Sequence, residues 1–316
     1  MTMANQIMAF GEILWDMLPG GKQLGGAPGN FAYHCHVLGS DAMIVSRIGN
    51  DDLGRGVTDE LRKRSIPTDF IGIDFERPTG TVEVELDRLG QSAYQIIEDV
   101  AWDRIKPSKA ALVYASGIDA ICFGSLALRS SANRVALASL LAAVPEGKLK
   151  VLDLNLRAPF YSAETVRSLL PLANVLKLND EELIQLGNLL GRDFAGEPFF
   201  AQNGEKGTTL SAAPAAFVEE LFTRLPLRYL ILTCGAKGSF IIDRTGRSSY
   251  RPTVPAEVVS SVGAGDAFSA VCVNGFLAGD DLDAVNERAS QYAAYICTQP
   301  GAMPTVEPIL LQKWGF

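Results

Sequence analysis

The chain has 316 residues, 47% of them hydrophobic and 20% charged, and its 36 acidic against 28 basic side chains give a net charge of −8. This length and apolar content are enough for a large buried core and argue against a disordered protein. Nucleic acids and anionic membranes attract basic patches, so the acidic balance argues against both as partners. The run after Gln6 includes Glu12 and Asp16, too much charge for a signal peptide or membrane span, and the five cysteines form no CxxC pair. We therefore expect a cytoplasmic protein.

Short apolar runs rich in β-branched residues alternate with stretches of helical period along most of the chain. We predict strands at 7–15, 42–48, 120–126, 150–156, 174–178, 229–233 and 239–242, and helices at 30–38, 131–144, 163–170 and 181–190. Continuous apolar strands separated by helices indicate an α/β fold, in which a mostly parallel sheet is covered by helices on both faces. Ligands of such sheets gather at the carboxyl ends of the strands. We expect a single domain over residues 1–316.

Two stretches break the alternation. Residues 81–96 alternate polar and apolar side chains around a turn near Leu89 and Gly90, the pattern of a hairpin with one wet and one dry face. We predict a small β lid over about residues 71–100, serving as a cover for a site, a dimer surface, or both. Residues 193–214 are rich in Gly, Ala and polar side chains and predict a long loop.

The most informative segment is Gly263-Ala264-Gly265-Asp266, which leads into an apolar helix. Glycines let backbone amides turn toward a ligand, and a helix N-terminus adds partial positive charge, so the turn is suited to an anion such as a phosphoryl group. Asp266 at its mouth has the position of a base that accepts a proton from an attacking hydroxyl. The alternative is an ordinary N-cap aspartate.

A second small-residue segment, Gly25-Gly26-Ala27-Pro28-Gly29-Asn30, precedes a predicted helix. It permits close approach of a ligand to the backbone, and the Asn30 amide suits sugar hydroxyls because it both donates and accepts. Asp16, at the end of the first predicted strand, lies where such sheets hold ligands. A plain strand-to-helix turn and a solvated strand end are the alternatives.

Two further segments carry polar residues at predicted strand ends. Strand alternation puts Asp153, Asn155 and Arg157 on one face, and polar groups that deep in a sheet need partners. Asn179 and Glu182, three residues apart at a helix start, suit phosphate-bound Mg²⁺ reached through water, or form a capping box.

The turn 233–238 joins two strands with glycines whose free amides suit nucleotide phosphates, or it is a simple hairpin turn. His34-Cys35-His36 resembles a metal cluster, but residues two apart on a helix point to different faces. The sequence has no GxxxxGK[ST] loop, no GxGxxG after the first strand and no GxSxG elbow, which disfavours Walker-type NTPases, standard dinucleotide enzymes and common hydrolases.

The ordered set of motifs resembles the ribokinase-like (PfkB) family of sugar kinases over essentially the whole chain. The motifs are Asp16, 25–30, 48–54 (IGNDDLG), 153–157 (DLNLR), Asn179 with Glu182, 233–238 (TCGAKG) and 263–266 (GAGD). The resemblance implies a ribokinase-like three-layer fold, with a central sheet, flanking helices and a β lid. It also implies ATP- and Mg²⁺-dependent phosphorylation of a sugar hydroxyl.

The resemblance also implies a role for each matching residue. Asp266 is similar to the catalytic base, and the amides of Gly263, Ala264 and Gly265 to the anion hole. Sugar contacts are implied for Asp16, Gly26 and Asn30, and nucleotide contacts for Asn179, Glu182, Thr233, Gly235 and Gly238. Ala293, Thr298, Gly301 and Ala302 are similar to the family's adenine-side segment. No residue is implied as a direct metal ligand; Glu182 is implied to act on Mg²⁺ through water.

One departure and one preference follow from the same resemblance. The family usually has Asp-Thr where this chain has Ser260-Ser261, which removes a charge associated with a monovalent cation site and predicts little dependence on K⁺. Residues 94–103 and 123–126 resemble bacterial fructokinases, so fructose is the expected substrate, with Trp102 as a wall of the sugar site or a core aromatic. Ribose is an alternative, as is 2-keto-3-deoxygluconate, whose acid group suits Arg157 unless that residue pairs with Asp153. A non-catalytic sugar-binding relative is a further alternative, and a homodimer through the lid is expected.

Overall fold

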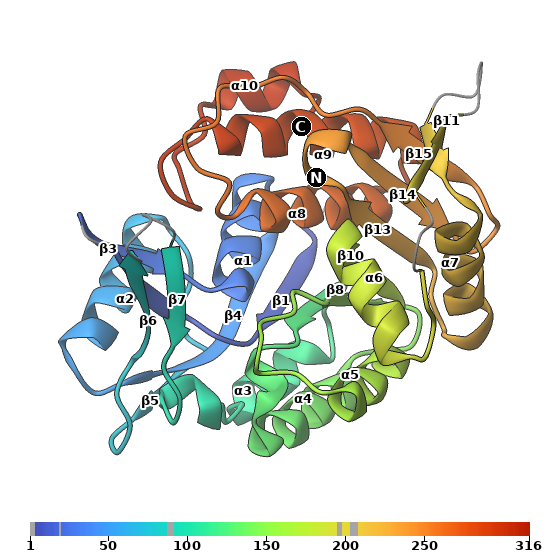
Figure 1. Cartoon of the computed structure of the whole chain (residues 1–316). Coiled ribbons are helices and arrows are strands. Elements are labelled where there is room, and N and C mark those ends of the chain that lie inside the picture. The colour runs from blue at the N-terminus through green and yellow to red at the C-terminus, as the bar shows by residue number, and fades with distance from the viewer. Residues whose placement is uncertain (1–3, 19, 87–91, 195–197, 203–207) are drawn as a thin grey trace.

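The computed structural model describes residues 4–18, 20–86, 92–194, 198–202 and 208–316. Nine of the described strands form one large sheet (Figure 1). Their order is β15 (Ser248–Arg251), β14 (Ser239–Asp243), β13 (Tyr229–Thr233), β10 (Val175–Asn179), β9 (Leu149–Asp153), β8 (Ala120–Gly124), β1 (Gln6–Phe10), β4 (Asp41–Gly49) and β5 (Ile71–Asp74). The pairs β13–β14 and β14–β15 are antiparallel and the six others are parallel, so the predicted mostly parallel sheet is confirmed.

Helices cover both faces of this sheet, as the alternation of elements predicts. One face packs against α1 (Ala27–Val37), α2 (Asp52–Lys63), α8 (Ala264–Ala278) and α9 (Leu282–Cys297), with α10 (Pro308–Lys313) beside them. The other face packs against α3 (Lys109–Ala115), α4 (Ser131–Ala143), α5 (Ala163–Leu169), α6 (Asp180–Leu189) and α7 (Ala212–Arg224). Short 3₁₀ helices lie at η1 (Ala101–Arg104), η2 (Ala127–Arg129), η3 (Leu170–Leu172) and η5 (Gly235–Lys237).

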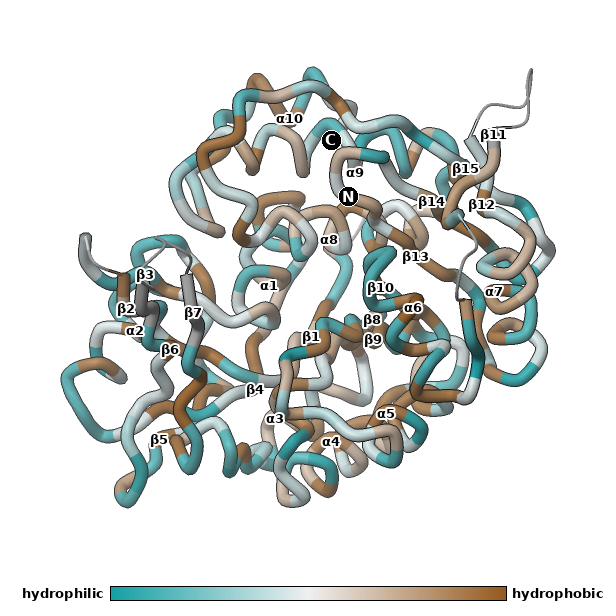
Figure 2. Tube along the Cα trace, viewed as in Figure 1, coloured by the Kyte–Doolittle hydropathy of each residue, from teal (hydrophilic) through white to brown (hydrophobic). Residues whose placement is uncertain are grey.

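Each face of the sheet packs against its own hydrophobic core, which accounts for the continuous apolar strands. Met8 and Phe10 of β1 point into one core, and Ile7 and Ala9 into the other. In Figure 2 hydrophobic residues run through the central strands, while hydrophilic residues recur on the outer turns of the peripheral helices. Within the described ranges, none of the helices is both long and apolar enough to cross a membrane.

The lid is a separate four-stranded sheet in the order β3 (Gly21–Gly25), β2 (Leu14–Leu18), β6 (Gly80–Leu86) and β7 (Ser92–Ile96). The predicted hairpin corresponds to β6 and β7, while its turn at Leu89 and Gly90 lies outside the described residues. Residues 14–25 supply the other half of this sheet, which the predicted boundary of about 71–100 misses. Conversely, β5 belongs to the large sheet.

The single strand predicted over 7–15 is wrong, because the chain bends at Gly11. Gly11 has a φ of 148°, and a Cβ there would lie 2.7 Å from Pro28 Cγ. The bend ends β1 at Phe10, and β2 then leaves the large sheet for the lid. The predicted loop over 193–214 is also wrong in part, since β11 (Phe200–Gln202) pairs with β12 (Thr208–Leu210) and α7 begins at Ala212.

Candidate active site

Helix α8 begins with the small-residue turn that the sequence singles out. Gly263 is its N-cap, with a φ of 79° that only glycine adopts readily, and no described side chain caps the helix. The Ala264 amide donates to Ser261 O at 3.3 Å, a long bond. A helix start left without a side-chain cap offers amides and partial positive charge to an anionic ligand.

Asp266 occupies the third position of α8, inside its first turn. The alternative reading as N-cap is therefore wrong. Its Oδ2 accepts a hydrogen bond of 2.7 Å from Asn30 Nδ2 of α1. Burial and the nearby Asp153 carboxylate raise the pKa of Asp266 from 3.8 to about 7, against the opposing effect of Lys177. A carboxyl with a pKa near neutrality is suited to take a proton from a hydroxyl and to release it later.

Asn30 is buried, and its two amide atoms have different environments. Nδ2 is occupied by Asp266, while Oδ1 has no hydrogen-bond partner among the described residues. A buried amide oxygen without a partner costs free energy unless a ligand or water donates to it. Asn30 thus contacts Asp266 through Nδ2, and its Oδ1 can accept a hydrogen bond from a hydroxylated ligand.

Glu12 lies at the carboxyl end of β1, the place that the sequence analysis gave to Asp16. Its side chain is only 3% exposed, and its Oε2 has no hydrogen-bond partner among the described residues. Burial raises the pKa of Glu12 from 4.5 to about 7, and the Asp266 charge adds to this rise. Sequence reasoning missed this residue because it treated the charge only as a sign against a signal peptide.

A buried ion pair lies beneath the first turn of α8. Lys177 Nζ of β10 is 3.0 Å from Asp153 Oδ1 of β9, and both side chains are buried. The same nitrogen lies 3.1 Å from where a Cβ of Gly265 would be, so residue 265 must be small. The Asp153, Glu182 and Asp266 carboxylates help raise the pKa of Lys177 to about 12, so its ammonium keeps its charge. Lys177 is a functional candidate that its sequence position alone does not reveal, because it lies inside the apolar strand β10.

Asp16 lies on lid strand β2 and faces the second glycine segment. A Cβ on Gly25 would lie 2.4 Å from Asp16 Oδ2, and one on Gly26, whose φ is 106°, would lie 2.5 Å from the Glu12 carbonyl oxygen. The glycine segment therefore packs tightly between the lid strand and the end of β1. Burial raises the pKa of Asp16 from 3.8 to about 6.

Arg157 is exposed, and its predicted geometry is wrong. Strand β9 ends at Asp153 and Asn155 has a φ of 36°, so strand alternation does not continue to residue 157. Asp153 pairs with Lys177 in place of Arg157. The Arg157 charge opposes the rise in pKa of Glu12, Asp16 and Asp266, so it acts electrostatically on all three carboxyls.

Asn179 and Glu182 form the capping box of α6. Asn179 Oδ1 accepts from the Glu182 amide at 2.8 Å, and Glu182 Oε2 accepts from the Asn179 amide at 2.8 Å. Glu182 Oε1 also accepts from the Leu156 amide at 2.8 Å, and burial raises the pKa of Glu182. Each carboxylate oxygen keeps a lone pair beyond these bonds, which fits a water bound to a metal ion.

The turn from 233 to 238 lies beside that capping box, because Thr233 pairs with Asn179 across β13 and β10. Gly235 and Gly238 have φ values of 51° and 98°, and a Cβ on Gly238 would lie 2.1 Å from the Arg251 carbonyl oxygen. Lys237 Nζ is 3.6 Å from Asp180 Oδ2. The two predicted nucleotide segments are therefore neighbours at the carboxyl ends of two adjacent strands.

Trp102 is fully buried in the core below the lid. The Arg129 guanidinium lies 4.2 Å from its ring centroid, and a Cβ on Gly80 would lie 2.1 Å from Trp102 Nε1. Of the two alternatives, Trp102 is therefore the core aromatic, and its side chain has no exposed surface that could line a sugar site.

The C-terminal residues singled out for adenine lie on α9 and on the segment that follows it. Ala293 and Thr298 belong to α9 and its C-cap, where Cys297 O accepts from the amides of Val259 and Ser260. Gly301 and Ala302 come just after the C-cap, with Ala302 packed against Gly263. Ser260 Oγ accepts from the Val262 amide at 3.3 Å, within the approach to α8.

Comparisons with known proteins place the chain among carbohydrate kinases. A family model described as pfkB family carbohydrate kinase matches residues 18–309. A fructokinase of Klebsiella pneumoniae is 26% identical over 294 residues, covering 88% of this chain and 85% of the relative. The crystal structure of a fructokinase with bound ATP from Xylella fastidiosa superposes with a TM-score of 0.79 at 24% identity, covering 98% of this chain and 99% of that one. That of 2-dehydro-3-deoxygluconokinase from Thermotoga maritima gives 0.80 at 21% identity, covering 98% of both chains.

Proposed function

Because the chain belongs to the pfkB family of carbohydrate kinases, we propose that it transfers the γ-phosphoryl group of ATP to fructose, forming fructose 6-phosphate. The observation that carries the proposal is the place of Asp266. A carboxyl with a pKa of about 7 stands inside the first turn of a helix that no described side chain caps, and whose Ala264 amide makes only a long bond to Ser261 O, so these amides can turn to an anion. A base beside an anion site is the arrangement that phosphoryl transfer to a hydroxyl requires.

The reaction follows from these groups. Asp266 accepts the proton of the attacking hydroxyl, whose oxygen forms a bond to the γ-phosphorus as the bond to the ADP oxygen breaks. The α8 amides stabilise the charge on the transferring group, and the ammonium of Lys177, beneath Gly265, adds to the positive potential there. Products are the sugar phosphate, ADP and a proton that Asp266 releases to water.

We place ATP and Mg²⁺ at the carboxyl ends of the neighbouring strands β10 and β13. Thr233, Gly235 and Gly238 would hold the nucleotide phosphates through turn amides and a hydroxyl. Mg²⁺ neutralises phosphate charge when bound. Among the described residues no cluster of three acidic, His or Cys side chains could hold it alone, so the phosphates and water must supply most ligands. Glu182 would orient one such water.

Fructose is proposed on the names of relatives and the resemblance of residues near the lid. Arg157 favours a second candidate, 2-keto-3-deoxygluconate, because an exposed guanidinium near Asp16 and Asp266 can pair with a sugar acid. The test is an ADP-release assay with Mg-ATP and fructose, ribose, 2-keto-3-deoxygluconate, glucose or adenosine. Preference for fructose supports the proposal. Preference for the sugar acid supports the second candidate, with Arg157 as the residue that determines specificity. With no turnover of any, calorimetry with fructose separates a binding protein from an untested substrate.

We also propose a homodimer formed through the lid. Ile73 and Phe75, at the end of β5 and on the connection to the lid, are 51% and 79% exposed and offer apolar surface for such a contact. Light scattering of the purified protein should give the mass of two chains, and Phe75→Ser should lower it toward one. A monomer at all concentrations would refute the dimer without touching the chemistry.

A further inference from the structure

Three consecutive carbonyl groups near the C-terminus are held by side chains from the first 64 residues of the chain. Ala302 O is 2.9 Å from His34 Nε2, Met303 O is 3.5 Å from Arg64 Nε, and Pro304 O is 2.6 Å from Tyr33 Oη. We call residues 300–304 the carbonyl segment. It has no helix or strand of its own. Its position therefore depends on these contacts with α1 and the end of α2.

His34 makes the most buried of the three contacts. Its ring is fully buried, with Nδ1 3.0 Å from Tyr292 Oη. Because a carbonyl oxygen can only accept, Nε2 must carry the proton that is donated to Ala302 O, and Nδ1 accepts from the Tyr292 hydroxyl. Burial lowers the pKa of His34 to about 4, so this neutral form persists at neutral pH. The histidine of the apparent metal motif is thus a satisfied hydrogen-bonding group.

The carbonyl segment contacts the proposed anion site directly. A Cβ on Gly263 would lie 2.6 Å from Ala302 Cβ, 2.8 Å from Ala302 Cα and 3.0 Å from Ala302 O. The N-cap of α8 therefore rests on Ala302, and the oxygen nearest to it is the one that His34 holds. A displacement of Ala302 frees or crowds the turn that presents the α8 amides and Asp266.

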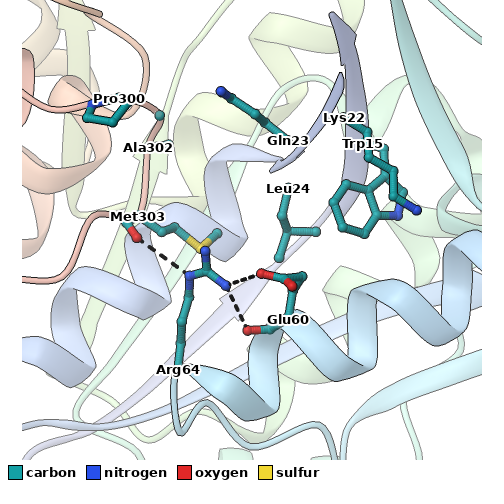
Figure 3. A pocket seen from close by; sticks show the side chains of 10 residues that line it. Trp15, Lys22, Gln23, Leu24, Glu60, Arg64, Pro300, Ala302 and Met303 are labelled. Atoms are coloured by element: carbon teal, nitrogen blue, oxygen red, sulfur yellow. Dashed lines mark hydrogen bonds and ion pairs between the residues drawn. The ribbon is translucent and has the colours of Figure 1, made fainter. Parts of the chain in front are cut away.

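This segment is also held by packing, since Ala302 and Met303 are buried in the core that α1, α8 and α9 share. It borders a cavity of about 360 Å³ that is also lined by Trp15, Lys22 and Gln23 of the lid and by Glu60 and Arg64 of α2 and its C-cap. Figure 3 shows Arg64 reaching from the helix end toward the Met303 carbonyl, with Glu60 beside it. The segment is thus packed in part and open in part, and the hydrogen bonds from Tyr33, His34 and Arg64 orient its carbonyl groups.

We propose that His34 is a positioning residue for phosphoryl transfer, which it supports by holding Ala302 against Gly263. This role rests on the proposed kinase function. His34 contacts neither substrate nor the transferring group and acts only through the carbonyl segment. Small displacements of a reacting group far from a mutated residue can lower a rate by about a hundredfold, so the effect is measurable.

Three single variants separate the two hydrogen bonds of His34. His34→Gln places an amide NH₂ near the position of Nε2 and keeps the donor to Ala302 O. His34→Asn is shorter and keeps only a group near Nδ1, so the donor to Ala302 O is lost. Tyr292→Phe removes the other hydrogen bond and leaves Nε2 in place. Melting temperatures of all three show how much each change affects the fold as a whole.

We expect His34→Asn to lower kcat about ten- to a hundredfold with little change in the sugar KM. His34→Gln should restore most of kcat, and Tyr292→Phe should keep it even if its melting temperature falls as far as that of His34→Asn. Equal loss of kcat in the Gln and Asn variants, or full kcat in His34→Asn, would overturn the proposal.

Hydrogen exchange supplies a readout that needs no turnover. Amides in peptides covering 261–266 and 301–306 should exchange faster in His34→Asn than in wild type, and at the wild-type rate in Tyr292→Phe. Unchanged exchange in His34→Asn refutes the contact between the carbonyl segment and the α8 turn. If the wild-type protein turns over no sugar, the kinase proposal fails while this exchange result still decides the role of His34 in holding the turn.

Discussion

Asn30 donates a hydrogen bond of 2.7 Å to Asp266, which joins α1 and α8 across 236 positions of sequence. The contact fixes the orientation of the carboxyl inside the first turn of α8. It uses Oδ2, and among the described residues no hydrogen bond to Oδ1 competes with a substrate proton. The predictions below follow from this arrangement and from the charges around it.

Asp266→Asn should lower kcat by a factor of about 10² to 10⁴, as expected for loss of a general base. The fold should persist, because Gly263 is the N-cap of α8 and the variant removes a buried charge. Steady-state kinetics and calorimetric sugar binding check this, with unchanged sugar affinity as the internal control. Near-normal turnover would exclude Asp266 as the base.

The activity should fall on the acid side of pH 7. Asp266 must be ionised to accept a proton, and its pKa is raised to about 7. Below that value kcat/KM should decrease about tenfold for each pH unit, because the ionised fraction decreases in that proportion. A profile of kcat/KM from pH 5 to 9 at saturating Mg-ATP checks this. A level profile down to pH 5 would place the titrating group elsewhere.

Glu12→Gln should change how stability depends on pH. The folded state raises the pKa of Glu12 from 4.5 to about 7, so between those values it binds a proton that the unfolded state has lost. The free energy of unfolding therefore falls as pH rises through that window, by up to about 1.4 kcal/mol per pH unit for one group. Relative to wild type, the variant should gain stability in urea unfolding at pH 8 but not at pH 5. A difference that is the same at both pH values would contradict this assignment.

Trp102→Phe should affect the fold more than the substrate. The indole is fully buried, so shortening it leaves a gap and should cost about 1 to 3 kcal/mol of stability. The sugar KM should stay close to the wild-type value. A large rise in the sugar KM with unchanged stability would indicate instead that Trp102 lines the sugar site.

Replacing K⁺ by a large organic cation should change the rate little. Ser260 supplies no charge in the approach to α8, and its hydroxyl already accepts from the Val262 amide. The measurement is kcat at constant ionic strength with tetramethylammonium in place of K⁺. Strong stimulation by K⁺ would show that a cation site survives without that charge.

The sequence predicts the large sheet well because its strands are continuous apolar runs with helices between them. Asp266 and the glycine turn are also predictable, since their spacing and residue types carry the chemistry. Glu12 and Lys177 are harder to identify, because a single charge in an apolar run does not show whether it is solvated or buried in a pair. The bend at Gly11, where Pro28 packs closely, puts Glu12 just beyond the end of β1 and Asp16 in the lid.

Trp102 illustrates a different limit. An aromatic residue next to a predicted lid has the same pattern whether it faces a ligand or the core. Its core position is set by contacts with Arg129 and Gly80. These residues lie 27 and 22 positions away in the sequence, so the local pattern around Trp102 does not reveal them. The same holds for His34, whose partner Ala302 is 268 positions distant.

The contact between His34 and Ala302 has a consequence for synthesis of the protein. Chains emerge from the ribosome N-terminus first and begin to fold as they do so. A nascent chain that has emerged as far as α8 already carries Asp266, Asn30 and the whole lid, yet lacks the residues that support the α8 turn. Catalytic competence must therefore come late, and translation that stops short of Ala302 would release a chain with every proposed catalytic group but an unsupported active site.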